Sequence, residues 1–289
     1  MSKALCPSSS LLLLGLGGLV LGGCAVNKQC YADGACRVVE NGEVRWEGPP
    51  DAVAAHTQQA AALQAESSDR AAAFASAEKR PASEPIRVLV VVRGGGGLRE
   101  LTGDYAAILG QELQRHPRLE VVTLKATGIL GKPEDGQSKI TTEYLTRLRD
   151  FGVKTDTVLW VNLSEKEKSG VVSGKSGVGV VKANVVQMSA QLSSIYEEEI
   201  FEDAVTGKST RGISVAGIDR EGKTSQGSLD TTRAVEHDRE ALQKLASWTE
   251  QTLETSIGPK LPSFAEIERI KTERGTGMDA LRKMLQGRN

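Results

Sequence analysis

The chain has 289 residues, of which 39% are hydrophobic and 25% are charged, and its formal net charge at pH 7 is −1. These are ordinary values for a globular protein, and a near-neutral balance excludes the strongly basic surface that is typical of nucleic-acid binding. The length allows one domain of average to large size together with tails.

The first segment predicts export and a lipid anchor. Residues 11–24 read LLLLGLGGLVLGGC, follow a short segment that carries Lys3, and are too short an apolar run for the roughly 20 residues that span a bilayer. The ending LGGC resembles a bacterial lipobox, in which small residues precede a cysteine that receives lipid. We therefore predict a signal peptide over 1–23 and a membrane tether through lipid on Cys24. An ordinary secretory signal or a short buried helix is the alternative.

The residue that follows Cys24 indicates in which membrane the lipid anchor is expected. Ala25 does not resemble an inner-membrane retention signal of bacterial lipoproteins. The expected location is therefore the outer membrane, with the chain facing the periplasm.

Residues 24–47 are predicted to form a lipidated N-terminus with a small hairpin. Cys30 and Cys36 are separated by YADGA, in which Asp33-Gly34 is a turn signal. An oxidising periplasm favours a disulfide between the two, and a metal site lacks a nearby histidine or further cysteine.

A second turn signal follows in the same region. Asn41-Gly42 between β-formers predicts a two-residue hairpin turn. In that register Val39 faces Val44, and Arg37 faces Trp46.

Residues 48–85 differ from the rest in composition. They begin with GPP and continue rich in Ala, Gln, Glu and Ser, with few large apolar side chains. Ala and Gln favour helix, but little apolar surface is available for burial. We predict a solvated helix or flexible tether, and a coiled coil would lack a sustained heptad pattern.

Residues 86–258 are predicted to form the folded head. The run IRVLVVV (86–92) is typical of a strand buried on both faces, and further strands are expected at 119–124 and 157–163. Two amphipathic helices lie between them, with a loop at about 126–139. Their apolar positions are Tyr105, Ile108, Leu109 and Leu113 in the first helix, and Tyr144, Leu145, Leu148 and Phe151 in the second.

In the second half of the head, apolar residues alternate with polar ones, as in strands that have one buried face. Apolar residues alternate over 186–196 and 213–217, which predicts a long antiparallel hairpin of 184–202 with 209–218 and a turn at Thr206-Gly207-Lys208. A helix over about 231–256 follows, with an apolar stripe of Leu242, Leu245 and Leu253. The remaining residues, 259–289, are expected to form a helical extension that is interrupted near Gly275.

These elements together predict an α/β fold. A mixed sheet is flanked by helices in the order β-α-β-α-β, followed by the long antiparallel hairpin and C-terminal helices.

This order resembles a domain shared by three groups of envelope proteins. They are the curli secretion channel lipoprotein, the outer-membrane activators of penicillin-binding proteins, and the N-terminal part of the Tol–Pal β-propeller protein. The resemblance covers 86–257 and rests on element order and on two turns, at 152–156 and 203–208. It implies a binding role without a catalytic motif. A curli-type pore is not favoured, because residues 169–182 contain glycine and lysine but no aromatic residue.

No catalytic or metal pattern emerges from the sequence. Two phosphate-loop lookalikes, at 174–176 and 207–209, have Ser169 and Glu202 where the motif needs glycine. Gly94 to Gly97 indicate a flexible turn, with an anion cradle as the alternative. The histidines are scattered, so no metal ligation is expected. They are His56, His116 and His237.

Acidic residues gather at 197–203, where a solvated hairpin edge is the expected interpretation. A glycosidase-like site would instead need two carboxylates across a cleft.

The sequence therefore predicts a non-catalytic, lipid-anchored binding or adaptor protein without a cofactor. It is expected to dock on or regulate an envelope complex through a protein partner. The alternatives are a self-assembling structural or secretion-complex subunit, which would be a homo-oligomer, and an envelope hydrolase.

Overall fold

The computed structural model describes residues 27–30, 36–40, 43–174, 177–197, 199–219, 221–230 and 235–277. The predicted signal peptide, Cys24 and the two turn dipeptides of the N-terminal region lie outside these residues. The chain divides into two compact units, residues 1–64 and residues 65–289.

The first unit contains a three-stranded antiparallel sheet of β1 (Asn27–Cys30), β2 (Cys36–Glu40) and β3 (Glu43–Gly48). Val39 lies opposite Val44, as predicted. The predicted pairing of Arg37 with Trp46 is wrong, because a register shift between positions 38 and 39 places Arg37 opposite Glu47. Such a bulge inserts an extra residue into one strand, which hairpin length alone does not reveal.

Helix α1 (Pro50–Ser76) follows, and its residues from Ala65 onward belong to the second unit. There Phe74 is buried, and its ring centroid lies 4.8 Å from that of Tyr196. Arg70 is buried too, and its Nη2 lies 3.2 Å from Oδ2 of Asp150. Residues 65–80 thus differ from the solvated segment expected for 48–85, because a few large side chains on one helix face reach the head.

The second unit is built on a six-stranded mixed sheet in the order β5-β4-β6-β7-β8-β9. Strand β4 (Ile86–Gly94) runs parallel to β5 (Leu119–Val122) and β6 (Thr157–Gly174). Strands β7 (Gly177–Ser194), β8 (Ile200–Asp219) and β9 (Thr224–Asp230) complete the sheet with antiparallel pairings. The predicted α/β fold with a mixed sheet is confirmed.

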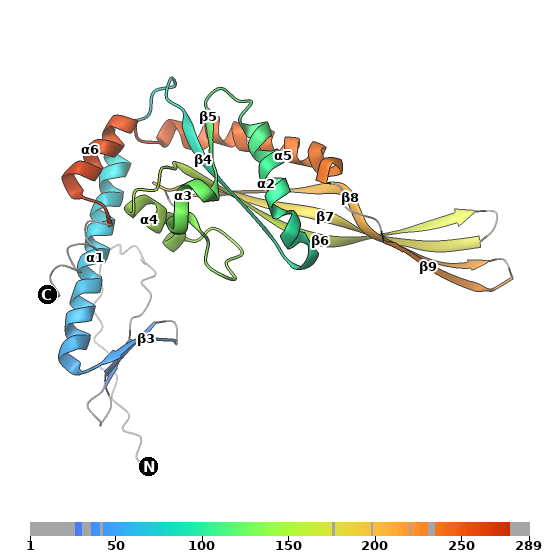
Figure 1. The fold of residues 1–289 in the computed structure, drawn as a ribbon, viewed down its shortest axis with the longest axis horizontal. Coiled ribbons are helices and arrows are strands. Elements are labelled where there is room, and N and C mark those ends of the chain that lie inside the picture. Colours follow the sequence, from blue (N-terminus) through green and yellow to red (C-terminus); the bar gives the residue numbers. More distant parts are fainter. Residues whose placement is uncertain are drawn as a thin grey trace, which may run out of the picture. The chain divides into compact units, whose positions relative to one another are not determined.

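The helices of the second unit cover the sheet over β4, β5, the first parts of β6 and β8 and the last part of β7 (Figure 1). They include α2 (Thr102–Leu113) and α4 (Thr142–Asp150), whose predicted apolar positions are largely buried. Helix α5 (Arg239–Thr252) continues through a π-helical turn, η3 (Leu253–Ile257), and a short 3-10 turn, η4 (Gly258–Lys260). Helix α6 (Phe264–Arg274) ends at a glycine with φ 69°, near the predicted interruption. The part of the predicted helical extension beyond residue 277 lies outside the described residues.

One helix occupies a segment expected to be a loop. Helix α3 (Leu124–Gly131) overlaps the stretch of about 126–139 for which the sequence predicted a loop. Thr123 caps it, because its side chain accepts a hydrogen bond from the backbone N–H of Ala126.

The predicted hairpin turn at residues 206–208 is wrong. Strand β8 runs unbroken through these residues, and the chain reverses instead between Ser194, where β7 ends, and Ile200, where β8 begins. Gly207 is needed here for close approach: a Cβ at this position would lie 2.1 Å from Oδ1 of the buried Asp238. A glycine inside a strand therefore marks a packing contact in this case, and not a turn.

Candidate functional site

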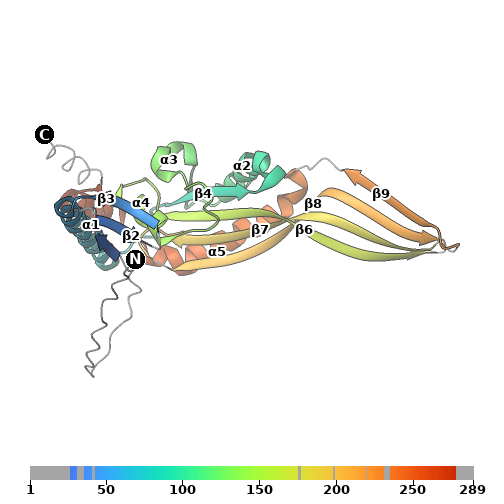
Figure 2. The same ribbon diagram turned by 90° about the horizontal axis from the view of Figure 1, so that it is seen from below.

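The sheet continues well beyond the end of β4. The last residue of β4, Gly94, pairs with Leu163, whereas β6 runs on to Gly174. We call its outer part the distal sheet, which comprises the paired residues 167–174, 177–184, 212–219 and 224–230. Figures 1 and 2 show these strands projecting past the helices as a single layer. Its strands are held together by antiparallel pairing of β6 with β7, β7 with β8 and β8 with β9.

The distal sheet exposes large apolar side chains. Six of them have exposed fractions between 39% and 72%: Val171, Val172, Val178, Val180, Val215 and Ile218. The register places Val171 opposite Val180 and Val178 opposite Ile218, so these four share one face. By the alternation of side chains along a strand, Val172 and Val215 lie on the other face. Clustered apolar residues of this kind mark interaction surfaces.

Both edges of the distal sheet are open among the described strands. Beyond Leu163, β6 pairs only with β7, and β9 pairs only with β8. Charged residues follow the β6 edge over 165–168 (EKEK), which discourages edge pairing. Farther along, residues 169–174 (SGVVSG) carry no charge, and β9 carries none before Asp230. These outer stretches therefore lack the usual protection against pairing with another strand.

At the opposite end of the sheet lies a buried ionic cluster centred on Asp156. Its carboxylate accepts hydrogen bonds from Arg80 Nη1 at 2.6 Å and Nη2 at 3.0 Å, and from Arg87 Nη2 at 2.9 Å. The backbone N–H of Arg87 donates to it as well, at 2.9 Å. Both guanidinium carbons lie within 4.4 Å of the Phe264 ring centroid. The cluster thus joins the segment that follows α1, strand β4, the residue that precedes β6, and α6.

Burial and charge act in opposite directions on Asp156. Burial alone would raise its pKa, but the hydrogen bonds and charges of Arg80 and Arg87 outweigh this effect and hold the pKa below the ordinary aspartate value. Every oxygen of this carboxylate is engaged by the protein. The 152–156 turn noted in the sequence therefore holds the fold together.

The acidic residues at 197–203 form surface contacts. Lys260 Nζ lies 2.8 Å from Glu199 and 3.6 Å from Glu197, and Glu202 accepts a hydrogen bond from Gln191 at 2.6 Å. The described members are exposed or half-buried, so the predicted solvated edge is confirmed.

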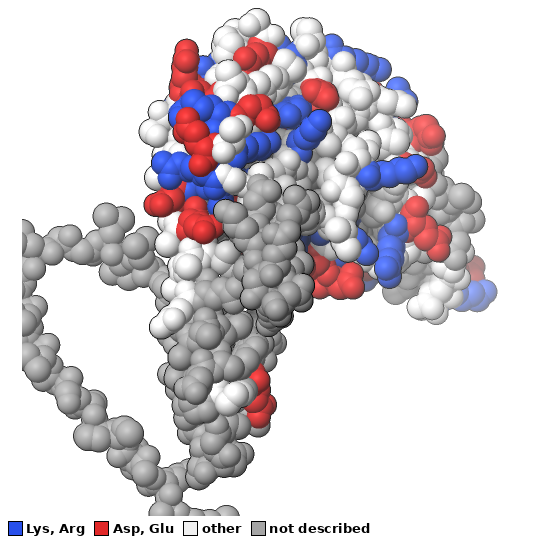
Figure 3. Space-filling view, turned by 60° about the vertical axis from the view of Figure 1, so that its left-hand side comes forward, with Lys and Arg blue, Asp and Glu red and all other residues white. Residues whose placement is uncertain are grey.

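The remaining candidate residues are not brought together. His116 Nε2 lies 3.0 Å from Glu254 Oε1, and His237 is exposed at a distant position. Among the described residues, no group of His, Cys, Asp or Glu is arranged to hold a metal ion. No helix in the described part of the chain has the length and hydrophobicity needed to cross a membrane. On the face in Figure 3, acidic and basic side chains are interspersed.

The two cysteines of the first unit are neighbours in the sheet. Cys30 of β1 lies opposite Cys36 of β2. Opposed Cα atoms in antiparallel strands lie about 4.5–5.5 Å apart, a separation that a disulfide spans. The register is compatible with the predicted disulfide, which stays a prediction.

Comparison with known proteins gives weak likenesses only. No protein-family model matches the chain, and no curated protein matches its sequence. Similar solved structures include a PelC dodecamer from Paraburkholderia phytofirmans, with 12% identity over 64% of this chain and 94% of that chain, and a TM-score of 0.28. A putative neuraminyllactose-binding hemagglutinin homologue from Helicobacter pylori shows 13% identity over 68% and 94%, with a TM-score of 0.30. Lipoprotein GNA1162 from Neisseria meningitidis shows 15% identity over 60% and 99%, with a TM-score of 0.27. These values assign neither a family nor a function, so the resemblance drawn from the sequence stays a prediction.

The distal sheet is the feature that sequence reasoning missed. In the sequence, residues 169–182 argue only against a curli-type pore and predict no projecting sheet. The usable signal is the recurrence of valine among glycine and serine over 170–174 and 177–181, which is typical of paired strands with little core to cover.

Proposed function

We propose that this protein is a lipid-anchored, non-catalytic binding protein of the bacterial envelope that docks on a protein partner through its distal sheet. The observation that carries the proposal is the exposure of apolar side chains on both faces of this single layer. Burying such surface in a complex is favourable by about 25 cal/mol per Å². The tether rests on the LGGC sequence at Cys24, and the outer-membrane location rests on Ala25.

The test uses charge substitutions on one face of the distal sheet. Val171→Asp and Val178→Asp place a carboxylate where the side chain is exposed, so the free energy of unfolding should change by less than about 0.5 kcal/mol. The control, Ser228→Asp, adds the same charge at an exposed position of β9.

The measurement is chemical crosslinking in intact cells, followed by identification of the captured envelope proteins. We expect the valine variants to lose a crosslinked partner that the wild type and the serine variant retain. Retention of every partner by both valine variants would contradict the proposal.

A second candidate function is self-assembly, and the open edges favour it. The uncharged outer parts of β6 and β9 lie at opposite edges of the same sheet, so one copy could pair with the next in a head-to-tail manner. Light scattering on the full-length protein separates the two candidates. A single closed oligomer that Val171→Asp dissociates would support self-assembly, and a monomer would support docking on a different protein.

A further inference from the structure

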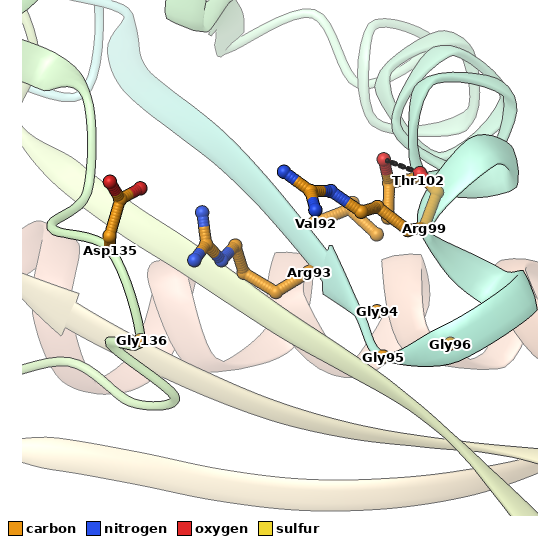
Figure 4. Close-up of a pocket in the computed structure, with 9 residues that line it drawn as sticks. All are labelled: Val92, Arg93, Gly94, Gly95, Gly96, Arg99, Thr102, Asp135 and Gly136. Atoms are coloured by element: carbon orange, nitrogen blue, oxygen red, sulfur yellow. Dashed lines mark hydrogen bonds between the residues drawn. The ribbon is translucent and has the colours of Figure 1, made fainter.

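A separate pocket lies in the second unit, at the carboxyl end of β4. Its volume is about 510 Å³, within the range of small-molecule sites. Figure 4 shows how its residues lie around the space. The lining comes from the end of β4, from the short 3-10 helix η1 (Gly96–Leu101), from the first residue of α2 and from the loop at 135–136.

The topology of the sheet favours a ligand site at this position. From β4 the chain crosses to β5 on one side, and from β5 it passes to β6 on the other side of β4. All three strands are parallel, so the carboxyl end of β4 lies where the strand order reverses. In open α/β sheets, ligands bind in the crevice outside the carboxyl ends of the strands at this reversal.

Two arginines and one aspartate supply the charge of the pocket. Arg93 comes from β4, Arg99 from η1, and Asp135 from the facing loop. Both guanidinium groups extend toward the side on which Asp135 lies (Figure 4). Within the described residues none of these three side chains forms an ion pair or a hydrogen bond. Arg99 and Asp135 are exposed, but Arg93 is half-buried. Most buried or half-buried arginines of this unit do form such pairs, including Arg70, Arg80, Arg87, Arg147 and Arg149.

Two neighbouring glycines line the pocket, and packing explains only the first of them. A Cβ at Gly94 would lie 3.0 Å from Cβ of Leu98, a tight contact, so packing favours glycine there. At Gly95 a Cβ would meet nothing within 4 Å, and the backbone is extended, with φ −90° and ψ 160°. Neither sterics nor conformation explains glycine at this second position. Its bare backbone instead leaves room for a ligand to approach closely.

We infer that this pocket binds a small zwitterion that carries a phosphate group next to an amine, such as a phosphoethanolamine group. Planar guanidinium groups hold phosphate oxygens through paired, charge-assisted hydrogen bonds. The Asp135 carboxylate would repel a bare phosphate but would pair with an adjacent ammonium group. The volume also exceeds what inorganic phosphate would fill. Such a group could belong to a lipid headgroup or to a soluble compound, and this inference does not depend on the distal sheet.

Calorimetric titration of the full-length protein with phosphoethanolamine and with inorganic phosphate tests the inference. Arg93→Gln and Arg99→Gln should each weaken phosphoethanolamine binding by about tenfold or more, because each removes a charged hydrogen bond. Asp135→Asn should weaken phosphoethanolamine binding only, leaving inorganic phosphate unchanged or bound more tightly. Gly95→Ala should weaken the binding of phosphoethanolamine without lowering the melting temperature.

A matched control is Lys125→Gln, which removes one positive charge at an exposed position outside the pocket and should leave binding unchanged. Competition with lipid vesicles distinguishes the two sources of the ligand. Phosphatidylethanolamine vesicles are added as the competitor, and phosphatidylglycerol vesicles serve as the reference. If phosphatidylethanolamine displaces phosphoethanolamine from the protein, the ligand is a lipid headgroup; if it does not, the ligand is a soluble compound. The inference is overturned if millimolar phosphoethanolamine does not bind, if both arginine variants bind it as the wild type does, or if inorganic phosphate binds equally tightly.

Discussion

Replacing Asp156 by Asn tests the buried cluster that joins four elements of the second unit. The substitution keeps the shape of the side chain but removes its charge, and it leaves the guanidinium groups of Arg80 and Arg87 without their shared partner. The side chains of Arg80 and Asp156 have no exposed surface, whereas that of Arg87 is 17% exposed. Breaking a buried ion pair in this way costs about 3–5 kcal/mol of the free energy of unfolding. Because Arg87 regains some hydration, we expect the free energy of unfolding to fall by about 3 kcal/mol.

The assay is urea unfolding of wild type and variant, followed by circular dichroism. Asp69→Asn is the matched control: the same chemical change at an exposed position of α1, with an expected effect below about 0.5 kcal/mol. A loss of less than about 1 kcal/mol for Asp156→Asn would refute the reasoning.

The pH dependence of the free energy of unfolding is an independent test of the role of the Asp156 carboxylate. Its pKa is lower in the folded protein than the ordinary value of about 3.9 that applies to the unfolded chain. The folded state therefore binds fewer protons, and its stabilisation is fully present above about pH 4 and is lost as the pH falls through the lowered pKa. We expect the stability of Asp156→Asn to depend less steeply on pH below about pH 4 than that of the wild type.

Three further predictions concern packing and covalent structure. Gly207→Ala should lower the free energy of unfolding by about 1–3 kcal/mol, because the new methyl group would overlap the Asp238 carboxylate. Phe74→Ala should lower it by about 3–5 kcal/mol, because this ring is buried in the core. Thermal unfolding followed by circular dichroism measures both effects. Mass spectrometry of the purified protein should show that reduction adds two hydrogens, as expected if Cys30 and Cys36 form a disulfide.

Each of these predictions has a result that would contradict it. Gly227→Ala serves as the control for the first, because a Cβ there would meet no atom within 4 Å. Equal stability of the two glycine variants would contradict the role given to close approach. A small effect of Phe74→Ala would mean that α1 is held to the head by its polar contacts. Unchanged mass on reduction would exclude the disulfide.

The parts of the fold that were predicted correctly rest on local patterns. The apolar run at 86–92 became β4, and the spacing of Tyr105, Leu109 and Leu113 became the buried face of α2. In both segments the period of hydrophobic residues directly reflects which side of the element is buried. The order of strands and helices could therefore be predicted without knowledge of contacts between distant residues.

The parts that were missed depend on residues far apart in the chain. The turn expected at Gly207 failed because the glycine accommodates Asp238, which is contributed by a later segment. The packing of α1 depends on Arg70 reaching Asp150 across 80 positions of sequence. The Asp156 cluster combines residues from four segments, and a single aspartate in a turn gives no local sign of two arginine partners. Such contacts follow from tertiary structure, which residue spacing does not encode.

The distal sheet and the core are parts of the same strands, and this continuity bears on function. In β6, Trp160 is fully buried in the core, whereas Val171, farther along, is 72% exposed. In β7 the buried residues Met188 and Leu192 give way to the exposed Val178. The distal part has no second layer of its own, and isolated sheet surface of this kind is only marginally stable in water. Its strands are therefore stabilised by their buried parts in the core, and its exposed valines lie beyond the end of the sheet that the helices cover. The distal sheet is held by the core but, among the described residues, has no second layer over its faces. Such a surface suits contact with another protein better than it suits an active site, which needs an enclosed pocket.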